Sequence, residues 1–276
     1  MREKPLITIT LNEKKQSIPA GLSIGKLRDR IMPMADVLVV NGFPSGPGNS
    51  LKDGDRVVFI SRGGVPKADE LEALMVARHT PGVHERMKAA MVGVAGLGGL
   101  GSAVTIALAR MGIGTLILAD YDVVEPSNLN RQHYALRHIG MAKTDAMAQI
   151  LADLNPYIRV ITHNVILERG NIPNLFKETE IIVECFDRAE AKAMILNTVS
   201  EFLPETFIIG ASGLAGYGDS NSIRTMKLGD KIFMVGDLVK AAEPGRGLMA
   251  PRVGIAAHHQ ANLVVALLMD PTNLEL

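Results

Sequence analysis

The sequence contains little cysteine and no tryptophan, and each absence excludes a class of protein. Cys185 is the only cysteine among the 276 residues, which excludes an internal disulfide bond and any zinc site built from several cysteines. This cysteine usage is typical of a reducing compartment, so we expect a cytoplasmic protein without zinc. Four tyrosines and no tryptophan provide no row of aromatic side chains on which nucleic-acid bases could stack.

The charge of the chain is balanced, and long apolar runs are missing. Its 29 basic and 29 acidic side chains give a formal net charge of zero, which argues against a protein that coats a polyanion. Residues 1–5 lack the apolar run of a signal peptide, and the apolar segment 253–269 carries His258 and Gln260. We therefore expect no membrane segment and no nucleic-acid partner. Apolar residues make up 47% of the chain, enough for the core of one or two domains.

Residues 1–64 form the first predicted domain. Strands are predicted over residues 6–11, 15–18, 37–40 and 56–60. A short helix, with Ser23 as its N-cap, separates the second strand from the third and ends before Pro33. The order strand, strand, helix, strand, strand is typical of a β-grasp, the ubiquitin-like fold.

Residues 65–276 form the second predicted domain, which begins with a linker and a helix from near Asp69 to residues 79–82. Strands are then predicted at 91–95, 115–119, 158–162, 181–185 and 206–210, with helices near 100–111, 142–154 and 189–202. Apolar strands that alternate with helices predict an α/β fold, a Rossmann-like and mostly parallel sheet with helices on both faces. Residues 212–250 are predicted to be irregular, and a last helix starts at Pro251.

Residues 96–101 form a glycine-rich loop between a predicted strand and a predicted helix. Gly96, Gly98, Gly99 and Gly101 permit a tight turn and let backbone N–H groups approach phosphates at the helix N-terminus. Asp120 ends the next strand, where a carboxylate can hold a ribose hydroxyl. The pattern predicts a nucleotide site but does not separate ATP from NAD. The alternative is a glycine-rich turn without a ligand.

Two cations favour ATP over NAD. Arg131 can donate two hydrogen bonds to phosphate oxygens, and Lys143 can supply a point charge. Attack on the α-phosphate of ATP spreads negative charge that such cations stabilise, whereas hydride transfer has no particular need of them. The alternative is that both are ordinary surface residues.

Asp187 follows the fourth predicted strand of this sheet, and ligands bind at the carboxyl ends of parallel strands. Its carboxylate can therefore bind a Mg²⁺ ion that bridges phosphates. The alternative is an N-cap for the helix that begins near Ala189. The spacing of the seven histidines predicts no metal site.

Taken together, residues 70–270 resemble the ThiF/MoeB family, bacterial relatives of ubiquitin-activating enzymes. The resemblance rests on the glycine loop ending in Ser102 and on residues 127–132 (Ser-Asn-Leu-Asn-Arg-Gln). It also rests on the aspartate pair in Asp120-Tyr121-Asp122, on Lys143 and on Asp187. It implies nucleotide binding by the loop glycines, Asp120, Asp122, Ser127, Asn128 and Gln132, and catalysis by Arg131, Lys143 and Asp187. Residues 1–64 resemble the sulfur carrier ThiS through residues 52–57 and Gly63-Gly64.

The resemblance implies adenylation of the C-terminal carboxylate of a ubiquitin-like sulfur carrier, with ATP and Mg²⁺, in thiamine biosynthesis or a related pathway. It also implies a homodimer in which an arginine before the first strand reaches the ATP of the partner. Arg78 is the candidate, and Arg86 is the second choice. Gly64 is joined to Val65 and has no free carboxylate, so the expected substrate is a separate carrier with a free Gly-Gly tail.

The sequence departs from the family in three ways. It has no Cys-x-x-Cys pairs for zinc, no cysteine within residues 212–250, and Arg188 where several relatives have asparagine after the aspartate. Thioester transfer by this chain alone is therefore not expected. Three other functions remain open: an NAD-dependent oxidoreductase, a non-catalytic carrier scaffold, and an enzyme that adenylates a small molecule or tRNA.

Overall fold

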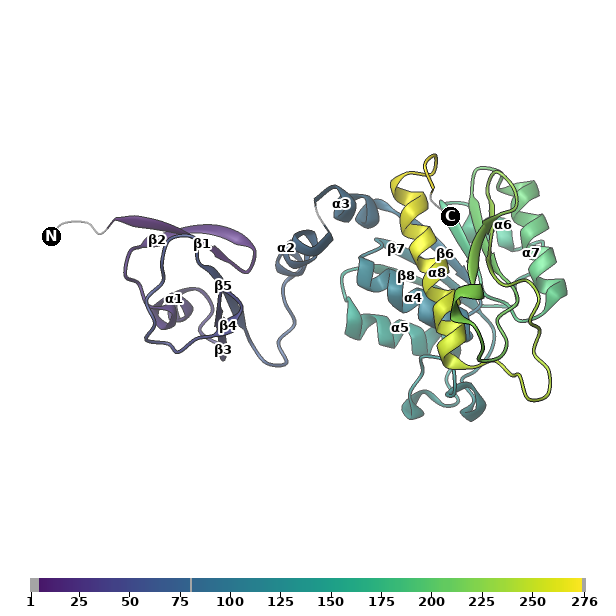
Figure 1. Ribbon diagram of the computed structural model, residues 1–276, viewed down its shortest axis with the longest axis horizontal. Helices are drawn as coiled ribbons and strands as arrows, with labels where there is room; N and C mark the ends of the chain where they lie inside the picture. Colours follow the sequence, from purple (N-terminus) through teal and green to yellow (C-terminus); the bar gives the residue numbers. More distant parts are fainter. Residues whose placement is uncertain (1–4, 80, 275–276) are drawn as a thin grey trace. The chain divides into compact units, whose positions relative to one another are not determined.

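The computed structural model describes residues 5–79 and 81–274. Two parts of the chain on which predictions rest lie outside the described residues. They are residues 1–4, which bear on the expected localisation, and Thr80, at the predicted end of a helix. The chain divides into two compact units, Met1–Pro81 and Gly82–Leu276, each of which is described separately (Figure 1).

The first unit contains a five-stranded sheet in the order β2-β1-β5-β3-β4. Its elements are β1 (Leu6–Leu11), β2 (Lys14–Pro19), α1 (Ile24–Ile31), β3 (Val37–Val40), β4 (Phe43–Pro44) and β5 (Arg56–Ile60). The pair β1–β5 is parallel, and the other pairs are antiparallel. The predicted β-grasp is confirmed, with the short β4 as the strand that the sequence pattern missed.

Local chemistry explains the elements of the first unit. Asn12 and Glu13 both have positive φ angles, 44° and 66°, as a two-residue hairpin turn between β1 and β2 requires. The Ser23 hydroxyl accepts the Lys26 N–H at 3.4 Å and caps α1, as predicted. Alternate residues such as Ile9 face the core between the sheet and α1. Helix α2 (Ala68–His79) follows the linker.

The second unit contains a seven-stranded sheet in the order β11-β12-β10-β9-β6-β7-β8. Its strands are β6 (Met91–Ala95), β7 (Thr115–Asp120), β8 (Arg159–Asn164), β9 (Ile181–Glu184), β10 (Phe207–Ala211), β11 (Arg224–Lys227) and β12 (Ile232–Gly236). Its helices are α3 (Pro81–Ala89), α4 (Gly99–Met111), α5 (Lys143–Leu154), α6 (Ile172–Phe176), α7 (Ala189–Phe202) and α8 (Ala250–Met269). Only the edge strand β11 pairs antiparallel, so the predicted α/β fold class is confirmed.

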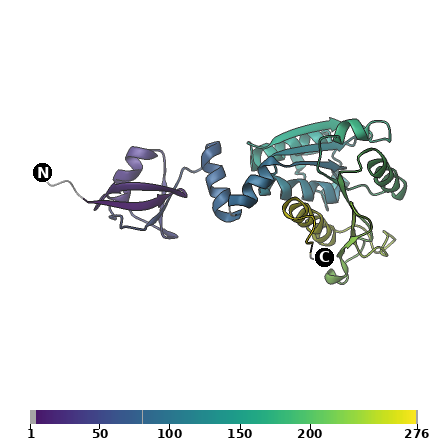
Figure 2. The same cartoon turned by 90° about the horizontal axis from the view of Figure 1, so that it is seen from above.

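Helices cover both faces of this sheet. Val92 and Val94 of β6 pack in a core with α4, α5 and α8, whereas Ala95 packs in a second core with α6 and α7. Figure 1 shows α6 and α7 on one side of the strands and α4, α5 and α8 on the other. Figure 2, seen from above, shows the yellow helix α8 on the side of the sheet away from α7. None of the described helices is both long and apolar enough to cross a membrane.

One prediction about this unit is wrong, and one helix was not predicted. Residues 212–250 are not irregular throughout, because they contain β11 and β12. The run Ile232-Phe233-Met234-Val235 consists of residues that favour strands, and it pairs parallel with β10. Strand β9 ends at Glu184, one residue before its predicted end, and Asp187 follows it in the turn beyond. Helix α2 ends at His79, within the predicted residues 79–82, but a further helix, α3, begins at Pro81, because proline is common at the first helical position.

Candidate nucleotide site

A cavity of about 720 Å³ lies where the strand order of the second unit reverses. The chain moves from β6 to β7 and β8 in one direction, and from β9 to β10 and β12 in the other. The carboxyl ends of strands at such a reversal form a crevice in which open α/β sheets bind ligands. The predicted residues that line the cavity are Gly96, Gly98, Gly99, Asp120, Asp122, Asn128, Arg131, Gln132, Lys143 and Asp187.

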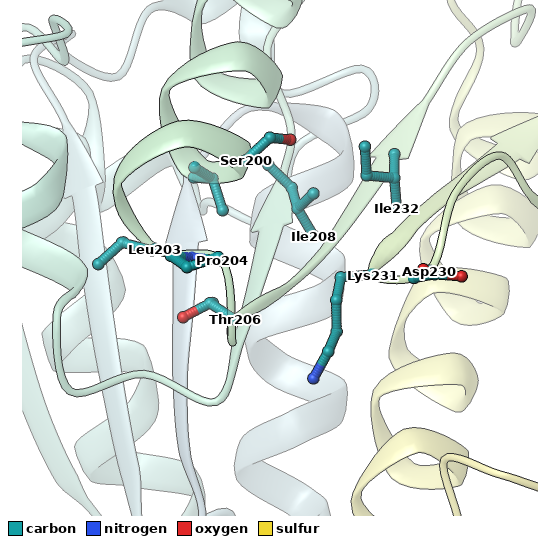
Figure 3. Close-up of a pocket in the computed structure, with 9 residues that line it drawn as sticks. Ser200, Leu203, Pro204, Thr206, Ile208, Asp230, Lys231 and Ile232 are labelled. Carbon is teal, nitrogen blue, oxygen red and sulfur yellow. The ribbon is translucent and has the colours of Figure 1, made fainter.

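A second cavity, of about 190 Å³, lies at the opposite edge of the sheet, near the first residues of β10 and β12 (Figure 3). Two of its polar side chains already have hydrogen-bond partners. The Thr206 hydroxyl donates to the Thr179 carbonyl at 3.1 Å, and the Lys231 ammonium donates to the Glu205 carbonyl at 3.2 Å. No predicted site residue lines it, so the predicted chemistry belongs to the larger cavity.

The glycine loop is shaped by close packing. Gly96 has a φ of +91°, which favours glycine. A Cβ atom on Gly101 would lie 1.8 Å from the carbonyl oxygen of Gly96, so no side chain fits there. Gly101 therefore packs the first turn of α4 against the loop and does not line the cavity, whereas Gly98 and Gly99 do. The loop keeps backbone without side chains at the N-terminus of a helix, as a phosphate site needs.

Asp120 is buried at the end of β7 and holds two segments of backbone. Its Oδ2 atom accepts the Leu97 N–H at 2.6 Å, and its Oδ1 atom accepts the Asp122 N–H at 2.8 Å. Burial raises the pKa of the Asp120 carboxyl, while Lys143 and these two N–H groups oppose the rise. Each carboxylate oxygen keeps a second lone pair with which a ligand hydroxyl can bond.

Lys143 is buried, which excludes the interpretation that it is an ordinary surface lysine. It is the first residue of α5, and its Nζ atom lies 2.8 Å from Oδ2 of the half-exposed Asp122. The guanidinium of the half-buried Arg131 donates to Asn130 Oδ1 at 2.9 Å. Both cations line the cavity on the side of the glycine loop.

The segment that leads into Arg131 contains a 3₁₀ turn, η1 (Pro126–Asn128). The side-chain oxygen of Asn128 accepts the Glu125 N–H at 3.1 Å and holds the turn. Gln132 is buried, lines the cavity, and has no hydrogen-bond partner for its Oε1 atom within the described part of the chain. Such an acceptor suits a hydroxyl or amine of a ligand. The exposed Ser127 hydroxyl donates to Glu125 at 3.2 Å and does not line the cavity.

Asp187 is exposed and lines the cavity from the turn that links β9 to α7. The N-cap of α7 is Arg188, whose side chain makes no capping bond, so the structure does not support an N-cap role for Asp187. Among the residues that the structure describes, five basic and three acidic side chains line the cavity. They are Arg131, Lys143, Arg188, Lys192 and Lys240, and Asp120, Asp122 and Asp187. This excess of positive charge suits an anionic ligand.

The two candidate arginines behave differently. Arg78 is exposed near the end of α2, in the first unit, whereas the cavity lies in the second. The guanidinium of Arg86 donates to the Leu268 carbonyl at 2.8 Å and also pairs with Glu180. Arg86 is thus bound within its own chain, which argues against the second choice for a shared site.

Residues 72–275 match the ThiF family, and residues 7–63 match the ThiS-like ubiquitin family. The chain belongs to the ThiF family. The resemblance expected from the motifs is therefore confirmed for both parts of the chain.

Curated relatives of this ThiF-family chain include "Adenylyltransferase and sulfurtransferase UBA4" of Candida glabrata, 34% identical over 158 residues, 56% of this chain and 36% of that protein. "Ubiquitin-like modifier-activating enzyme 5" of Drosophila willistoni is 34% identical over 155 residues, 51% of this chain and 38% of that protein. The chain thus spans little more than a third of the length of these relatives.

Among solved structures, the E. coli tRNA N6-threonylcarbamoyladenosine dehydratase, TcdA, in complex with ATP, has a similar fold. Its TM-score is 0.66 at 20% identity, and the match covers 75% of this chain and 97% of that one. At this identity the likeness concerns the fold alone.

Sequence reasoning missed three charged residues at this site of the ThiF-family unit. Lys192 and Lys240 line the cavity, from α7 and from the turn after β12. Glu184 is fully buried and accepts hydrogen bonds from Lys192 Nζ at 2.9 Å and from the Phe186 N–H at 2.6 Å. Burial raises the pKa of the Glu184 carboxyl, which Lys192 opposes. In the sequence, the only sign of the Glu184–Lys192 pair is an acidic residue at the end of an apolar strand.

Cys185 lies beside Glu184 and is buried. Burial raises the pKa of its thiol well above the usual range, and the neighbouring Glu184 carboxylate adds to the rise. The thiolate is the nucleophilic form of cysteine. The structure therefore disfavours a role for Cys185 in thioester chemistry.

Proposed function

We propose that this protein uses ATP to adenylate the C-terminal carboxylate of a ubiquitin-like sulfur carrier. The observation that carries the proposal is one cavity, in a ThiF-family fold, lined by the glycine loop, Arg131 and Lys143. The adenylyltransferase and activating-enzyme names of the curated relatives support the same reaction class.

ATP fits the cavity better than a neutral ligand would. The loop at Gly98 and Gly99 is the start of α4, where backbone N–H groups and the helix dipole favour phosphates. Asp120 would accept hydrogen bonds from ribose hydroxyls, and Gln132 offers an unpaired acceptor nearby. The five cationic side chains match a triphosphate and a carboxylate in the same cavity.

Asp187 fits a Mg²⁺ ion, because such ions in nucleotide sites are commonly held by one or two carboxylates together with phosphates and water. The carboxylate is exposed toward the cavity and takes no part in capping α7. Bound there, Mg²⁺ would neutralise part of the charge on the phosphates.

The reaction forms a bond between a carboxylate oxygen of the carrier and the α-phosphorus of ATP. The bond from the α-phosphorus to the bridging oxygen breaks, and pyrophosphate leaves with that electron pair. Arg131 and Lys143 would stabilise the negative charge that spreads over the phosphates. We propose a homodimer in which Arg78 of one chain supplies a further cation to the site of the other.

The substrate in this proposal is a separate carrier with a free Gly-Gly tail, in thiamine biosynthesis or a related cytoplasmic pathway. Gly64 is bonded to Val65, so its carbonyl belongs to an amide and offers no carboxylate. Its N–H donates to the Ser61 carbonyl at 3.0 Å within a turn. Residues 1–64 would act as a docking or regulatory domain. Detection in native cells of a fragment ending at Gly64, by intact-mass spectrometry, would contradict this role.

Exchange of label between pyrophosphate and ATP tests the function directly. We expect exchange only when a ThiS-like carrier with a free Gly-Gly tail and Mg²⁺ are both present. The same carrier with an amidated tail is the matched control and should give none. Exchange with tRNA or a small carboxylic acid, but not with the carrier, would change the substrate class. Absence of exchange together with NAD binding would overturn the proposal.

A further inference from the structure

Among the described residues, the wall of the cavity formed by the end of β10 and the segments that follow β10 and β12 carries one cation, Lys240. Four other described lysines and arginines line the cavity. Arg131 and Lys143 belong to the glycine-loop side, Arg188 lies in the turn after β9, and Lys192 lies in α7. Because β9 separates β6 from β10 in the sheet, Lys240 lies across β9 from the glycine loop.

The turn that presents Lys240 is firmly built. Asp237 Oδ1 accepts the N–H groups of Val239 and Lys240, both at 2.9 Å. Leu238 has a φ of +60°, a conformation that costs energy for a leucine and persists only when its surroundings impose it. A Cβ atom on Gly213 would lie 2.2 Å from Asp237 Oδ1, so the backbone after β10 packs directly against this turn.

Charge at this turn is not balanced. Arg252, buried at the start of α8, lies 2.6 Å from Asp237 Oδ2, and Lys240 Nζ lies 3.5 Å from the same oxygen. The other hydrogen bonds of Arg252 go to the Gly218 and Asp219 carbonyls and to the Ser222 hydroxyl, none of which carries charge. Burial opposes ionisation of Asp237, but the two N–H groups and the cations hold its pKa below the usual range. Two cations therefore share one carboxylate.

The excess positive charge is available to a ligand only at Lys240. Arg252 is 3% exposed, whereas the Lys240 side chain is 36% exposed and lines the cavity. In the proposed reaction a carboxylate must approach phosphates of the same sign of charge. A cation across β9 from the phosphate loop would hold that carboxylate while the loop holds ATP.

We propose that Lys240 binds the substrate carboxylate and selects a peptide tail that ends in a free carboxylate. This inference rests on the proposed function and assigns the residue that recognises the nucleophile. Arg252 is then a positioning residue, because it fixes Asp237, which in turn fixes the Lys240 turn.

A binding experiment tests the assignment. The probe is a synthetic peptide with the Gly-Gly tail of a carrier, as free acid and as C-terminal amide, titrated into the full chain with a non-hydrolysable ATP analogue. We expect the wild type to prefer the free acid by about tenfold to a hundredfold, the range of one charged hydrogen bond. Lys240→Gln should remove the preference, and Lys240→Arg should retain most of it. Lys231→Gln, a lysine at the small cavity, is the matched control and should behave as wild type.

The same variants in the exchange assay provide a second measurement. Lys240→Gln should raise the KM for the carrier about tenfold to a hundredfold and leave the KM for ATP unchanged. No preference in the wild type, or an unchanged preference in Lys240→Gln, would overturn the assignment even if exchange is active. Absence of exchange with every carrier would instead refute the proposed function, since the peptide measurement does not require turnover.

Discussion

The carboxylate of Asp120 joins the end of β7 to the glycine loop, because its Oδ2 atom accepts the Leu97 N–H at 2.6 Å. The residue predicted to hold the ribose therefore also holds the loop that would receive the phosphates. A change at Asp120 is expected to act on both parts of the nucleotide site.

Asp120→Ala should lower the affinity for MgATP by about tenfold to a hundredfold, because the ribose loses a charged acceptor. The Leu97 N–H would also lose its acceptor, so the melting temperature should fall. Calorimetric titration with MgATP and with NAD measures the affinities, and Asp153→Ala, on the exposed face of α5, is the control. Binding of NAD without binding of ATP would contradict the nucleotide assignment.

Mixing two inactive variants should restore activity if Arg78 acts across a dimer. In a mixed dimer of Arg78→Ala and Lys143→Ala, one site keeps both residues and the other has neither. Half of the dimers are mixed after full exchange, so we expect about a quarter of wild-type pyrophosphate exchange. Mixtures that stay inactive after verified subunit exchange would show that Arg78 does not complete the site of a partner.

Cys185 should make the protein less stable at alkaline pH. Burial raises the pKa of the folded thiol, so the unfolded thiol, with a pKa of about 8.5, ionises first. Unfolding then releases a proton, and this contribution to stability is complete below that pKa and declines as pH rises, by up to about 1.4 kcal/mol per pH unit. Denaturant unfolding from neutral to alkaline pH should show the decline in the wild type and a weaker one in Cys185→Ala. Parallel curves would mean that the folded thiol also ionises.

Two glycine-to-alanine changes should shift stability in opposite directions. In Gly101→Ala the new methyl group would lie 1.8 Å from the Gly96 carbonyl oxygen, and we expect a loss of about 1–3 kcal/mol or more. Gly254 lies within α8, and a Cβ atom there would meet nothing within 4 Å beyond its chain neighbours and its own helix backbone, so Gly254→Ala should stabilise the protein by about 0.5–1 kcal/mol. Thermal unfolding compares the two, and a stable Gly101→Ala protein would show that the loop can move away from α4.

Most elements and the main motifs could be predicted from the sequence because their signals are local. The run Met91–Ala95, the glycines after it and Asp120 occur in an order that indicates strand, loop, helix and strand. Residues 6–60 likewise show the alternation and turn residues of a β-grasp. The predictions failed where one local signal had two meanings, as at Pro81, or where a strand lay inside a glycine-rich stretch, as at Ile232–Gly236.

Only the tertiary structure decided which distant residues share the cavity. The order of strands brings the turn after β12 and the start of α7, which follows β9, to the same crevice as the glycine loop, so Lys240 and Lys192 join Lys143 there. Which side chains are buried also depends on packing. Burial distinguishes Lys143 from an ordinary surface lysine and raises the pKa of the Cys185 thiol. Residue type and spacing indicate which chemistry a chain can carry. The distances between side chains, their burial and the grouping of charges in one cavity depend on how the strands are ordered and packed.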